Sequence, residues 1–456
     1  MTATLLELLQ KYSVPGPRYT SYPTAPYFRT DFGEADWADA LAAASVDRGL
    51  SLYAHIPFCD TLCHFCGCNM VATRDYSKTQ PYLVQLDQEM ARTAHQVDPG
   101  RVVRQLHWGG GTPTYLNPDD IRRLMGMMRR HFTLAAEAEI SCEIDPRELT
   151  RAHLEALRES GFNRVSFGVQ DMDPAVQQAV NRIQSRDLIQ QVLDWSRELG
   201  FSSINLDLIV GLPKQTVASF RRTLEQVTEW SPDRLAVFAY AHVPWLKKHQ
   251  RLIKEDDLPD SATRLGLQQA VNEILGAVGY VNIGLDHYAR PDDELVRAQQ
   301  NKTLWRNFQG YTTHKNCDIL AFGVSSISQT ADVYMQNDKN LKRYQERIAA
   351  TGYAVERGLK LTRDDQIRRD AITRVMCDLE LDFAAFGREW NIAFTDYFVD
   401  ALADLRPLAD DGLVALATDR ISVTPRGRLF LRNIGMCFDR YLKEAAGTQP
   451  RYSRTA

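Results

Sequence analysis

The sequence predicts an α/β protein built around a partial or complete TIM-like (β/α) barrel. Between residues 50 and 290, short runs rich in β-branched and aromatic residues alternate with amphipathic helical patterns. The chain has 456 residues, enough for two or three domains and a large buried core. Hydrophobic residues make up 44% and charged residues 25% of it, and these fractions exclude a mostly disordered chain. An open doubly wound sheet produces the same alternation, so it remains the alternative.

Six strands are predicted in this region, and a helical pattern follows each of the first five. The strands cover residues 51–56, 103–109, 138–144, 164–170, 204–211 and 234–241. Parallel strands of this kind carry their functional groups at their carboxyl ends, so we expect the groups there to meet on one rim. They are the cysteine-rich stretch after the first strand, Gly109–Pro113, Glu143, Asp145, Gln170, Asp171, Asp207, Ala241 and His242.

Two further regions flank the predicted barrel, which we place at residues 49–350. Residues 1–48 form an N-terminal arm and helix, and Pro17 and Pro23 favour an extended arm over a continuous helix. Residues 351–456 form a mostly helical, winged-helix-like C-terminal domain, in which a hairpin precedes an amphipathic helix with Pro425 near its start. A winged helix suits nucleic acid, but the net charge of −4 gives no basic field, so we expect no nucleic-acid partner.

The cysteines are concentrated in one place. The sequence shows no signal-peptide pattern and no run of 18 apolar residues, so we expect a cytoplasmic protein without membrane contact. Four of the eight cysteines, Cys59, Cys63, Cys66 and Cys68, fall within ten residues. In a reducing compartment such a cluster is expected to bind a metal rather than form disulfides.

The spacing C-x3-C-x2-C-x-C narrows the kind of metal site. Thiolates are soft ligands that suit zinc or iron–sulfur clusters. Structural zinc sites usually use two separated cysteine pairs, and the sequence has no second pair. Bacterial ferredoxin sites have a different spacing. A structural zinc site and four unrelated buried thiols remain the alternatives to an iron–sulfur site.

With Phe65 before the third cysteine, the cluster resembles the C-x3-C-x-aromatic-C signature of radical S-adenosylmethionine (SAM) enzymes. The glycine run at Gly109–Pro113 is similar to the segment that meets the methionine end of SAM in those enzymes. The blocks GPRYTSYPT, CHFCGCN, LHWGGGTPTYL, GFNRVSFGVQD and NFQGYTT narrow the resemblance to the oxygen-independent coproporphyrinogen III oxidase (coproporphyrinogen dehydrogenase) family. It covers residues 16 to about 439, and the arm and Cys68 distinguish this family from related haem chaperones.

The resemblance implies an oxidoreductase of haem (porphyrin) biosynthesis. Such an enzyme converts two propionate side chains of coproporphyrinogen III to vinyl groups, without oxygen, and forms protoporphyrinogen IX. It does so with a 5′-deoxyadenosyl radical from reductive cleavage of SAM at one 4Fe–4S cluster. The resemblance also implies two SAM molecules, a low-potential electron donor of the flavodoxin or ferredoxin type, and a barrel of the radical SAM type. We expect the protein to be a monomer.

The site residues of the family match positions of this sequence block by block. The matched cluster ligands are Cys59, Cys63 and Cys66, which leaves one iron open to SAM. Taken singly, a strand-end carboxylate can instead cap the next helix, and Tyr53 or Ile327 can be a core residue. The positions matched to the first SAM are Tyr53, Gly110, Glu143, Ala241 and Ile327, and those matched to the second are Phe65, Gly111, Thr112, Gln170, Arg182 and Asp207.

Three residues are expected to be catalytic: Tyr53, His55 and Cys68. The resemblance leaves Cys68 off the cluster yet needed for activity, and the alternatives are a fourth cluster ligand or a passive thiol. His55 ends the first strand beside the cysteines, where it can orient the metal ligands, although a buried core histidine is the commoner case.

Four residues outside the barrel motifs are candidates for holding the substrate. We hypothesise that Arg18, Tyr19, Tyr22 and Arg290 do so, because planar guanidinium groups suit the carboxylates of a tetracarboxylate. The alternative is that they only pack the arm against the barrel.

Three other functions fit part of the sequence. A haem-binding chaperone would retain haem without turnover, and a related radical SAM methyltransferase would release S-adenosylhomocysteine. A nucleic-acid-binding protein would rest on the C-terminal domain alone. The arm and Cys68 favour the oxidase over all three.

Overall fold

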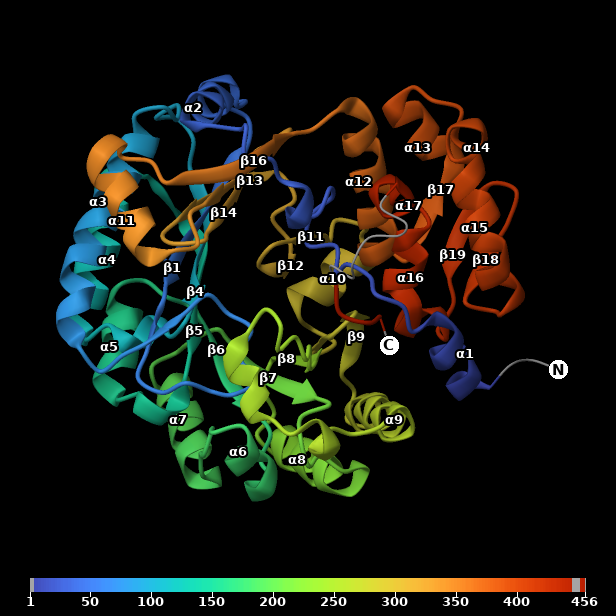
Figure 1. The fold of residues 1–456 in the computed structure, drawn as a ribbon, viewed down its shortest axis with the longest axis horizontal. Coiled ribbons are helices and arrows are strands. Elements are labelled where there is room, and N and C mark those ends of the chain that lie inside the picture. Colours follow the sequence, from blue (N-terminus) through green and yellow to red (C-terminus); the bar gives the residue numbers. More distant parts are fainter. Residues whose placement is uncertain (1–3, 445–451, 456) are drawn as a thin grey trace.

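The computed structural model describes residues 4–444 and 452–455, and it confirms an α/β fold with a large sheet that is parallel at its centre. All six predicted strands are present, and consecutive ones pair in parallel (Figure 1). They are β1 (Gly49–Ile56), β4 (Val103–Gly110), β5 (Leu134–Ile144), β6 (Arg164–Gln170), β7 (Ser203–Val210) and β8 (Arg234–Ala239).

The sheet does not close into a complete barrel. Its twelve strands run in the order β16-β15-β14-β13-β1-β4-β5-β6-β7-β8-β10-β9, so β16 and β9 are its two edges. Only β13 adds to the parallel centre, beside β1, and the other added strands pair antiparallel. The added strands are β9 (Val281–Gly284), β10 (His287–Ala289), β13 (Cys317–Phe322), β14 (Ile327–Gln329), β15 (Val333–Asn337) and β16 (Val355–Lys360).

The helices that connect the parallel strands lie along one face of the sheet, as an arc outside it (Figure 1). Leu52, Ala54 and Ile56 of β1 are fully buried in the core on this side. Because side chains alternate along a strand, Tyr53 and His55 point to the opposite, inner face. These helices are α3 (Thr79–Ala94), α4 (Pro118–His131), α5 (Arg151–Glu159), α6 (Pro174–Ala179), α7 (Arg186–Glu198) and α8 (Val217–Glu229). The next helix, α9 (Ser261–Ala277), leads from β8 to the edge strand β9 and packs on α8.

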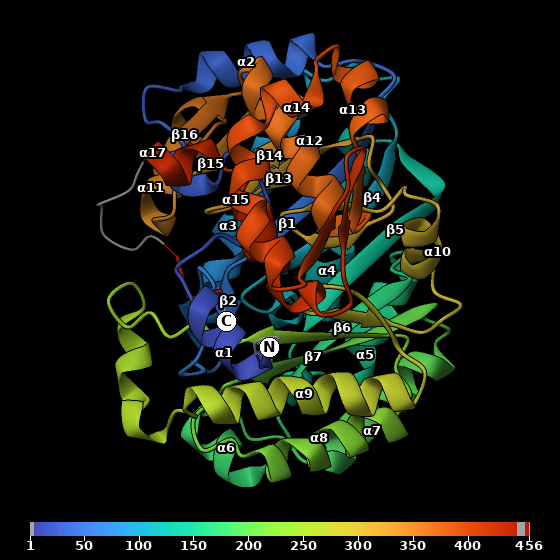
Figure 2. The same cartoon turned by 90° about the vertical axis from the view of Figure 1, so that its right-hand side faces the viewer.

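A second core lies in the C-terminal part of the chain, which stands beside the barrel (Figures 1 and 2). Its hairpin, β18 (Val414–Leu416) and β19 (Arg420–Val423), and the helix after Pro425, α16 (Leu431–Met436), are present as expected. The other elements there are α10 (Glu294–Gln300), β11 (Trp305–Asn307), β12 (Gly310–Thr312), α12 (Arg363–Cys377), β17 (Glu380–Asp382), α13 (Phe383–Trp390), α14 (Phe394–Tyr397), α15 (Val399–Asp410) and α17 (Arg440–Glu444). The helix α11 (Leu341–Thr351) instead packs on α3 in the first core.

The N-terminal part carries two helices, α1 (Leu5–Tyr12) and α2 (Glu34–Ala43), and the arm between them has no helix over residues 13–24. The division of the chain at residues 48 and 350 stays a prediction, and β16 continues the large sheet as far as Lys360. No helix within residues 4–444 and 452–455 is long and apolar enough to cross a bilayer.

A buried carboxyl group in α3 holds the turn that follows β13. Glu89 accepts hydrogen bonds from the backbone nitrogen of Gly323 (2.8 Å) and the hydroxyl of Tyr344 (2.7 Å), and Asn337 donates to its other oxygen. Burial raises the pKa of Glu89 to about 7, although these hydrogen bonds oppose the increase. The turn leads directly to Ile327, so Glu89 positions a part of the chain that was matched to SAM.

Replacing Glu89 by glutamine should make the stability of the protein depend less on pH. Because the pKa rises from 4.5 to about 7 on folding, the folded state keeps a proton that the unfolded state loses between these values. Stability therefore falls as the pH rises through this window, by at most about 1.4 kcal/mol per pH unit, and levels off above it. Urea unfolding from about pH 5 to about pH 8 measures this slope.

The control for this comparison is Glu137→Gln, because Glu137 is a well-exposed carboxylate on β5. Its stability should follow the wild-type curve. Parallel curves for wild type and Glu89→Gln would contradict the raised pKa.

Candidate active site

The cysteine loop, residues Cys59–Cys68, follows β1 at the carboxyl end of the sheet. Cys63 is buried, Cys59 and Cys66 are half-buried, and Cys68 is exposed. The loop is tied to the end of α6, where the backbone nitrogen of His64 donates to the carbonyl of Val180 (2.9 Å). It therefore sits on the predicted rim with its backbone anchored.

Two guanidinium groups lie beside Cys63. Arg147 donates to its sulfur at 3.2 Å and Arg182 at 3.5 Å. Both arginines also pair with Asp145, at 2.6 and 3.0 Å. Burial acts to raise the pKa of Asp145, but the two arginines outweigh burial and hold that pKa at about 2. The two positive charges therefore lie where a metal-bound sulfur would carry negative charge.

The other thiols have different surroundings. The backbone nitrogen of Cys68 donates to the sulfur of Cys66 at 3.4 Å. Hydrogen bonding from Cys68 lowers the pKa of Cys66 to about 6, and the same pairing raises the pKa of Cys68. Cys59 lies 3.4 Å from the hydroxyl of Thr112, and burial raises its pKa to about 12.

The four cysteines offer an all-sulfur donor set, which suits an iron–sulfur cluster. Across the part of the chain that the structure describes, no three His, Cys, Asp or Glu side chains are grouped so that they could hold one metal ion. In a 4Fe–4S cluster each thiolate binds its own iron, so the sulfurs need not converge on one point. Thiolates are the ligands that such clusters use, and the positive charges of Arg147 and Arg182 lie beside Cys63. The assignment of Cys59, Cys63 and Cys66 as ligands stays a prediction.

The glycine run at the end of β4 lies against the end of β1. A Cβ at Gly110, where φ is 116°, would lie 2.6 Å from the imidazole of His55. A Cβ at Gly111 would lie 2.7 Å from the backbone of Pro57. Only glycine permits this approach, which lets Gly111 donate a backbone hydrogen bond to Ile56 (2.8 Å).

His55 connects β1 to the far end of the cysteine loop. Its Nε2 lies 2.8 Å from the carbonyl oxygen of Asn69, so this nitrogen carries the hydrogen, and Nδ1 then accepts from the hydroxyl of Tyr53 (3.2 Å). Burial lowers the pKa of His55, which favours this neutral form. The histidine therefore fixes the backbone just after Cys68.

Glu143, at the end of β5, faces the glycine run. It accepts from the backbone nitrogen of Gly110 (3.1 Å) and lies 3.4 Å from His107, whose ring stacks on Tyr53. Burial acts to raise the pKa of Glu143, but its bonds to His107 and Gly110 outweigh burial and lower it. Glu143 is therefore ionised and able to accept hydrogen bonds from a ligand.

Two further polar groups lie on the inner face of β6 and β7. Asp207 accepts from Asn205 (2.8 Å) and Ser166 (3.1 Å). Burial raises its pKa to about 7, and the nearby charge of Glu143 adds to the effect. Gln170 adopts a φ of 66°, which is costly for this residue, and its side-chain oxygen is buried without a hydrogen-bond partner in the described chain.

The remaining residues matched to SAM also lie at this end of the sheet. Arg182 donates twice to the carbonyl of Gly168 in β6. Ile327 begins β14 and packs against a small cluster of Phe28, Tyr334 and Leu361. The carbonyls of Phe65 and Ala241 accept from one side chain, the fully buried Gln250, which joins the cysteine loop to the end of β8.

The arm residues Arg18, Tyr19 and Tyr22 have different surroundings in the structure. Arg18 stays at the rim, where it pairs with Asp286 (2.9 Å) and donates to the carbonyl of Ala239 (2.9 Å) at the end of β8. Tyr19 and Tyr22 are 5% and 1% exposed and belong to the second core. They are therefore packing residues rather than substrate contacts, which corrects that part of the hypothesis.

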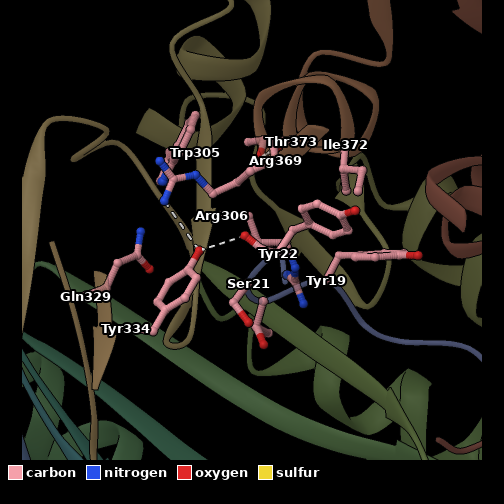
Figure 3. A pocket seen from close by; sticks show the side chains of 11 residues that line it. Tyr19, Ser21, Tyr22, Trp305, Arg306, Gln329, Tyr334, Arg369, Ile372 and Thr373 are labelled. Carbon is pink, nitrogen blue, oxygen red and sulfur yellow. Dashed lines mark hydrogen bonds between the residues drawn. The ribbon is translucent and has the colours of Figure 1, made fainter. Parts of the chain in front are cut away.

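Figure 3 shows these tyrosines beside residues of β11 and α12. The hydroxyl of Tyr19 donates to Asp439 (2.9 Å), and that of Tyr22 accepts from the backbone nitrogen of Arg440 (3.1 Å). The cavity they line has room for about one water molecule. Such a water can accept from Arg306, whose buried Nε and Nη1 have no partner in residues 4–444 and 452–455.

Arg290 is not at the rim, which corrects its assignment as a substrate residue. It follows β10, which runs antiparallel to β8, and its backbone nitrogen donates to Asp233 (3.0 Å), just before β8 begins. Arg290 therefore lies at the amino end of the sheet. The sequence pattern gave no sign that the strand before it reverses direction.

Sequence reasoning missed several residues of the site. Arg147 contacts Cys63, and His107 contacts Glu143. Gln250 joins the cysteine loop to the end of β8. Arg147 follows the end of β5 by three residues, so its place at a strand end was a usable signal. Gln250 has no such signal, because its partners are backbone carbonyls distant in sequence.

Nearly the whole chain is similar to known proteins. Residues 53–227 match the family model for the Radical SAM superfamily, and residues 361–430 match the HemN C-terminal domain. Oxygen-independent coproporphyrinogen III oxidase of Escherichia coli (strain K12) is 52% identical over 97% of both chains, and that of Pseudomonas aeruginosa 46% over 98% of both. The solved structure of coproporphyrinogen III oxidase from Escherichia coli, reported as a radical SAM enzyme, is 50% identical. It aligns with a TM-score of 0.92 and covers 96% of this chain and 98% of that one.

Removing single thiols should separate cluster ligands from Cys68. After anaerobic reconstitution, Cys63→Ala is expected to lose the iron, sulfide and visible absorption of a 4Fe–4S cluster, because one iron loses its thiolate. Cys68→Ala should retain them, since Cys68 lies at the exposed end of the loop and contacts Cys66 instead. Cys317→Ala, outside the loop, is the control. Loss of the cluster from Cys68→Ala would make Cys68 a ligand.

Proposed function

The chain belongs to the family of oxygen-independent coproporphyrinogen III oxidases within the radical SAM superfamily, and from this membership we propose its reaction. The protein converts two propionate side chains of coproporphyrinogen III to vinyl groups and releases protoporphyrinogen IX and two CO2. The observation that supports this most is the meeting of the cysteine loop, the glycine run and Glu143 at one rim.

The residues at the rim hold the reacting groups. When bound, the 4Fe–4S cluster and SAM supply a carbon-centred radical able to take a hydrogen atom from a propionate side chain. Cys59, Cys63 and Cys66 bind the cluster. Glu143 offers its carboxylate to the amino group or ribose hydroxyls of SAM, which are hydrogen-bond donors. Gly110 leaves room for the imidazole of His55, and its backbone nitrogen donates to Glu143 beside the proposed SAM site.

A second SAM molecule is part of the proposal. Gln170 supports it, because its buried oxygen has no partner among the described residues and can accept from a ligand. Asp207 supports it as well. Its carboxyl group has a pKa raised to about 7, and a hydrogen-bond donor or a positive charge on a ligand would stabilise the ionised form. Gln170 lies on β6, which is next to the strand β5 that carries Glu143, and Asp207 lies on β7, the next strand along the sheet.

Tyr53, His55 and Cys68 have separate proposed roles. Tyr53 and His55 are positioning residues, because their hydrogen-bonded pair ends on the backbone after Cys68. Cys68 is exposed beyond the three ligands, where its thiol can donate or accept a proton during turnover.

The substrate carboxylates are proposed to bind three cations on the inner side of the sheet. Ile327, Gln336 and Arg357 lie in register on β14, β15 and β16, so their side chains share one face. The Nε of Arg357 donates to Gln336 (2.8 Å), and its two terminal nitrogens have no hydrogen-bond partner in the described chain. A guanidinium with a free pair of nitrogens can bind a carboxylate through two hydrogen bonds.

Lys247 and Lys339 approach the same place from other segments. Lys247 donates to the carbonyl of Cys68 (2.8 Å), and the carbonyl of Lys339 accepts from Asn69 (3.0 Å). Burial lowers the pKa of Lys339, and the charges of Arg357 and Lys247 lower it further, so the three cations are near one another. Arg18 at the end of β8 stays in the proposed site.

The setting of the reaction is also a proposal. We place the protein in the cytoplasm as a monomer, without nucleic-acid or membrane partners, and supplied with electrons by a low-potential carrier. The net charge of −4 supports the absence of a nucleic-acid partner.

Anaerobic turnover tests the proposed function. Cluster-loaded protein with coproporphyrinogen III, SAM and a low-potential reductant should form protoporphyrinogen IX and about two 5′-deoxyadenosine per product, one for each propionate. Equilibrium dialysis should find two SAM per cluster-loaded chain. Formation of 5′-deoxyadenosine without a decarboxylated tetrapyrrole would discard the substrate, and stable haem binding with neither product would favour the chaperone.

Replacing Arg357 by alanine should weaken substrate binding selectively. The loss of a charged hydrogen-bonding pair predicts a KM for coproporphyrinogen III that is about 10- to 100-fold higher. The KM for SAM and the iron content should not change, and Arg357→Lys should restore part of the affinity. Arg290→Ala is the matched control, because Arg290 is exposed at the opposite end of the sheet. An unchanged KM in Arg357→Ala would remove Arg357 from the site.

A further inference from the structure

The segment between β8 and α9 covers the cysteine loop from outside and projects from the body of the protein at the left of Figure 2. Its inward side chains each make a hydrogen bond to a backbone carbonyl of the cysteine loop. The pairs are Gln250 with Phe65 (2.9 Å), His249 with Cys66 (2.7 Å) and Lys247 with Cys68 (2.8 Å).

The outward side of the same segment is apolar and basic. Trp245, Leu246 and Leu252 are 62%, 67% and 62% exposed, and they are three of only nine large hydrophobic side chains exposed in the described residues. Their concentration within eight residues makes a patch rather than scattered exposure. We call this the outer patch, and it consists of Trp245, Leu246, Lys248, Arg251, Leu252 and Lys254.

The charge of the outer patch contrasts with that of the whole protein. Residues 243–254 include four lysines or arginines and no acidic residue, whereas the chain has a net charge of −4. Acidic residues begin only at Glu255, in the following turn (Glu255–Asp257). The outer patch therefore presents local positive charge around an exposed tryptophan.

We propose that the outer patch is the docking surface for the electron donor, a small acidic flavin or iron–sulfur protein of low potential. The inference rests on the proposed function, because one electron then passes from the reduced carrier to the cluster, and no atom is transferred. The segment is bonded directly to the loop that holds the cluster ligands, so a carrier seated there is close to the cluster.

The chemistry of the patch suits this partner. Electron-transfer complexes are small and short-lived, so they need a limited apolar contact and attraction at a distance rather than a large interface. Trp245 supplies a contact of the type that carries binding energy in interfaces. The basic side chains Lys248, Arg251 and Lys254 attract an acidic carrier and speed its association.

Stopped-flow reduction of the cluster tests the proposal. Cluster-loaded wild type, Lys248→Glu and Trp245→Ala are mixed anaerobically with reduced bacterial flavodoxin at about 0.02 M and about 0.3 M salt. We expect the second-order rate to fall at least about tenfold in Lys248→Glu at low salt, and the difference to shrink at high salt. Calorimetric titration of the cluster-free proteins with oxidised flavodoxin should show weaker binding in both variants.

Two controls make the outcome specific. Lys342→Glu carries the same charge change on an exposed residue of α11 and should behave as wild type. Dithionite should reduce the cluster of every variant at the wild-type rate and support the same turnover, which keeps this test separate from the proposed function. Unchanged rates with flavodoxin would overturn the proposal, and so would equal losses with dithionite. The proposal would also be overturned if Trp245→Ala still bound flavodoxin but no longer bound vesicles of anionic phospholipid. The outer patch would then bind a membrane surface instead of the electron donor.

Discussion

The site depends on the contact between the glycine run after β4 and the end of β1. At Gly110 and Gly111 any side chain would overlap His55 or the backbone of Pro57, so these positions bring two strand ends closer than other residues allow. The contact fixes where the chain leaves β1, and Cys59 follows three residues after Ile56. It also directs the backbone nitrogen of Gly110 toward Glu143. One steric constraint thus places the first cysteine and the first carboxylate relative to each other.

Ion pairs offset the free-energy cost of burying charged groups at the site. The inner face carries several buried ionisable groups, and burying an unpaired charge is expensive. Asp145 is compensated by Arg147 and Arg182, and the same two arginines face Cys63. Asp207 forms no ion pair within the described residues, and burial raises its pKa to about 7. The ion-paired groups of the rim therefore surround the cysteines. Asp207, which has no such pair in the described chain, lies where the second SAM is proposed to bind.

The sequence predicted the strands and their order well, because each strand of the parallel centre is a compact hydrophobic run followed by an amphipathic helix. It also predicted which strand ends carry the site, since parallel strands place these ends together. It could not predict how segments distant in sequence meet. Arg290 was misplaced because β10 reverses direction, and Tyr19 and Tyr22 were misjudged because their burial depends on the C-terminal domain. The roles of Gln250 and Arg357 were missed for the same reason, since their positions depend on pairings that no local pattern records.

The central claim is that the rim directs hydrogen abstraction from a propionate side chain of the substrate. The most direct measurement uses coproporphyrinogen III deuterated at the β-carbons of its propionates, with single-turnover analysis of 5′-deoxyadenosine by mass spectrometry. The account predicts that the released 5′-deoxyadenosine carries one deuterium in its methyl group and that protoporphyrinogen IX forms in step with it. Unlabelled 5′-deoxyadenosine alongside a decarboxylated product would contradict the account, because the hydrogen would then come from another position.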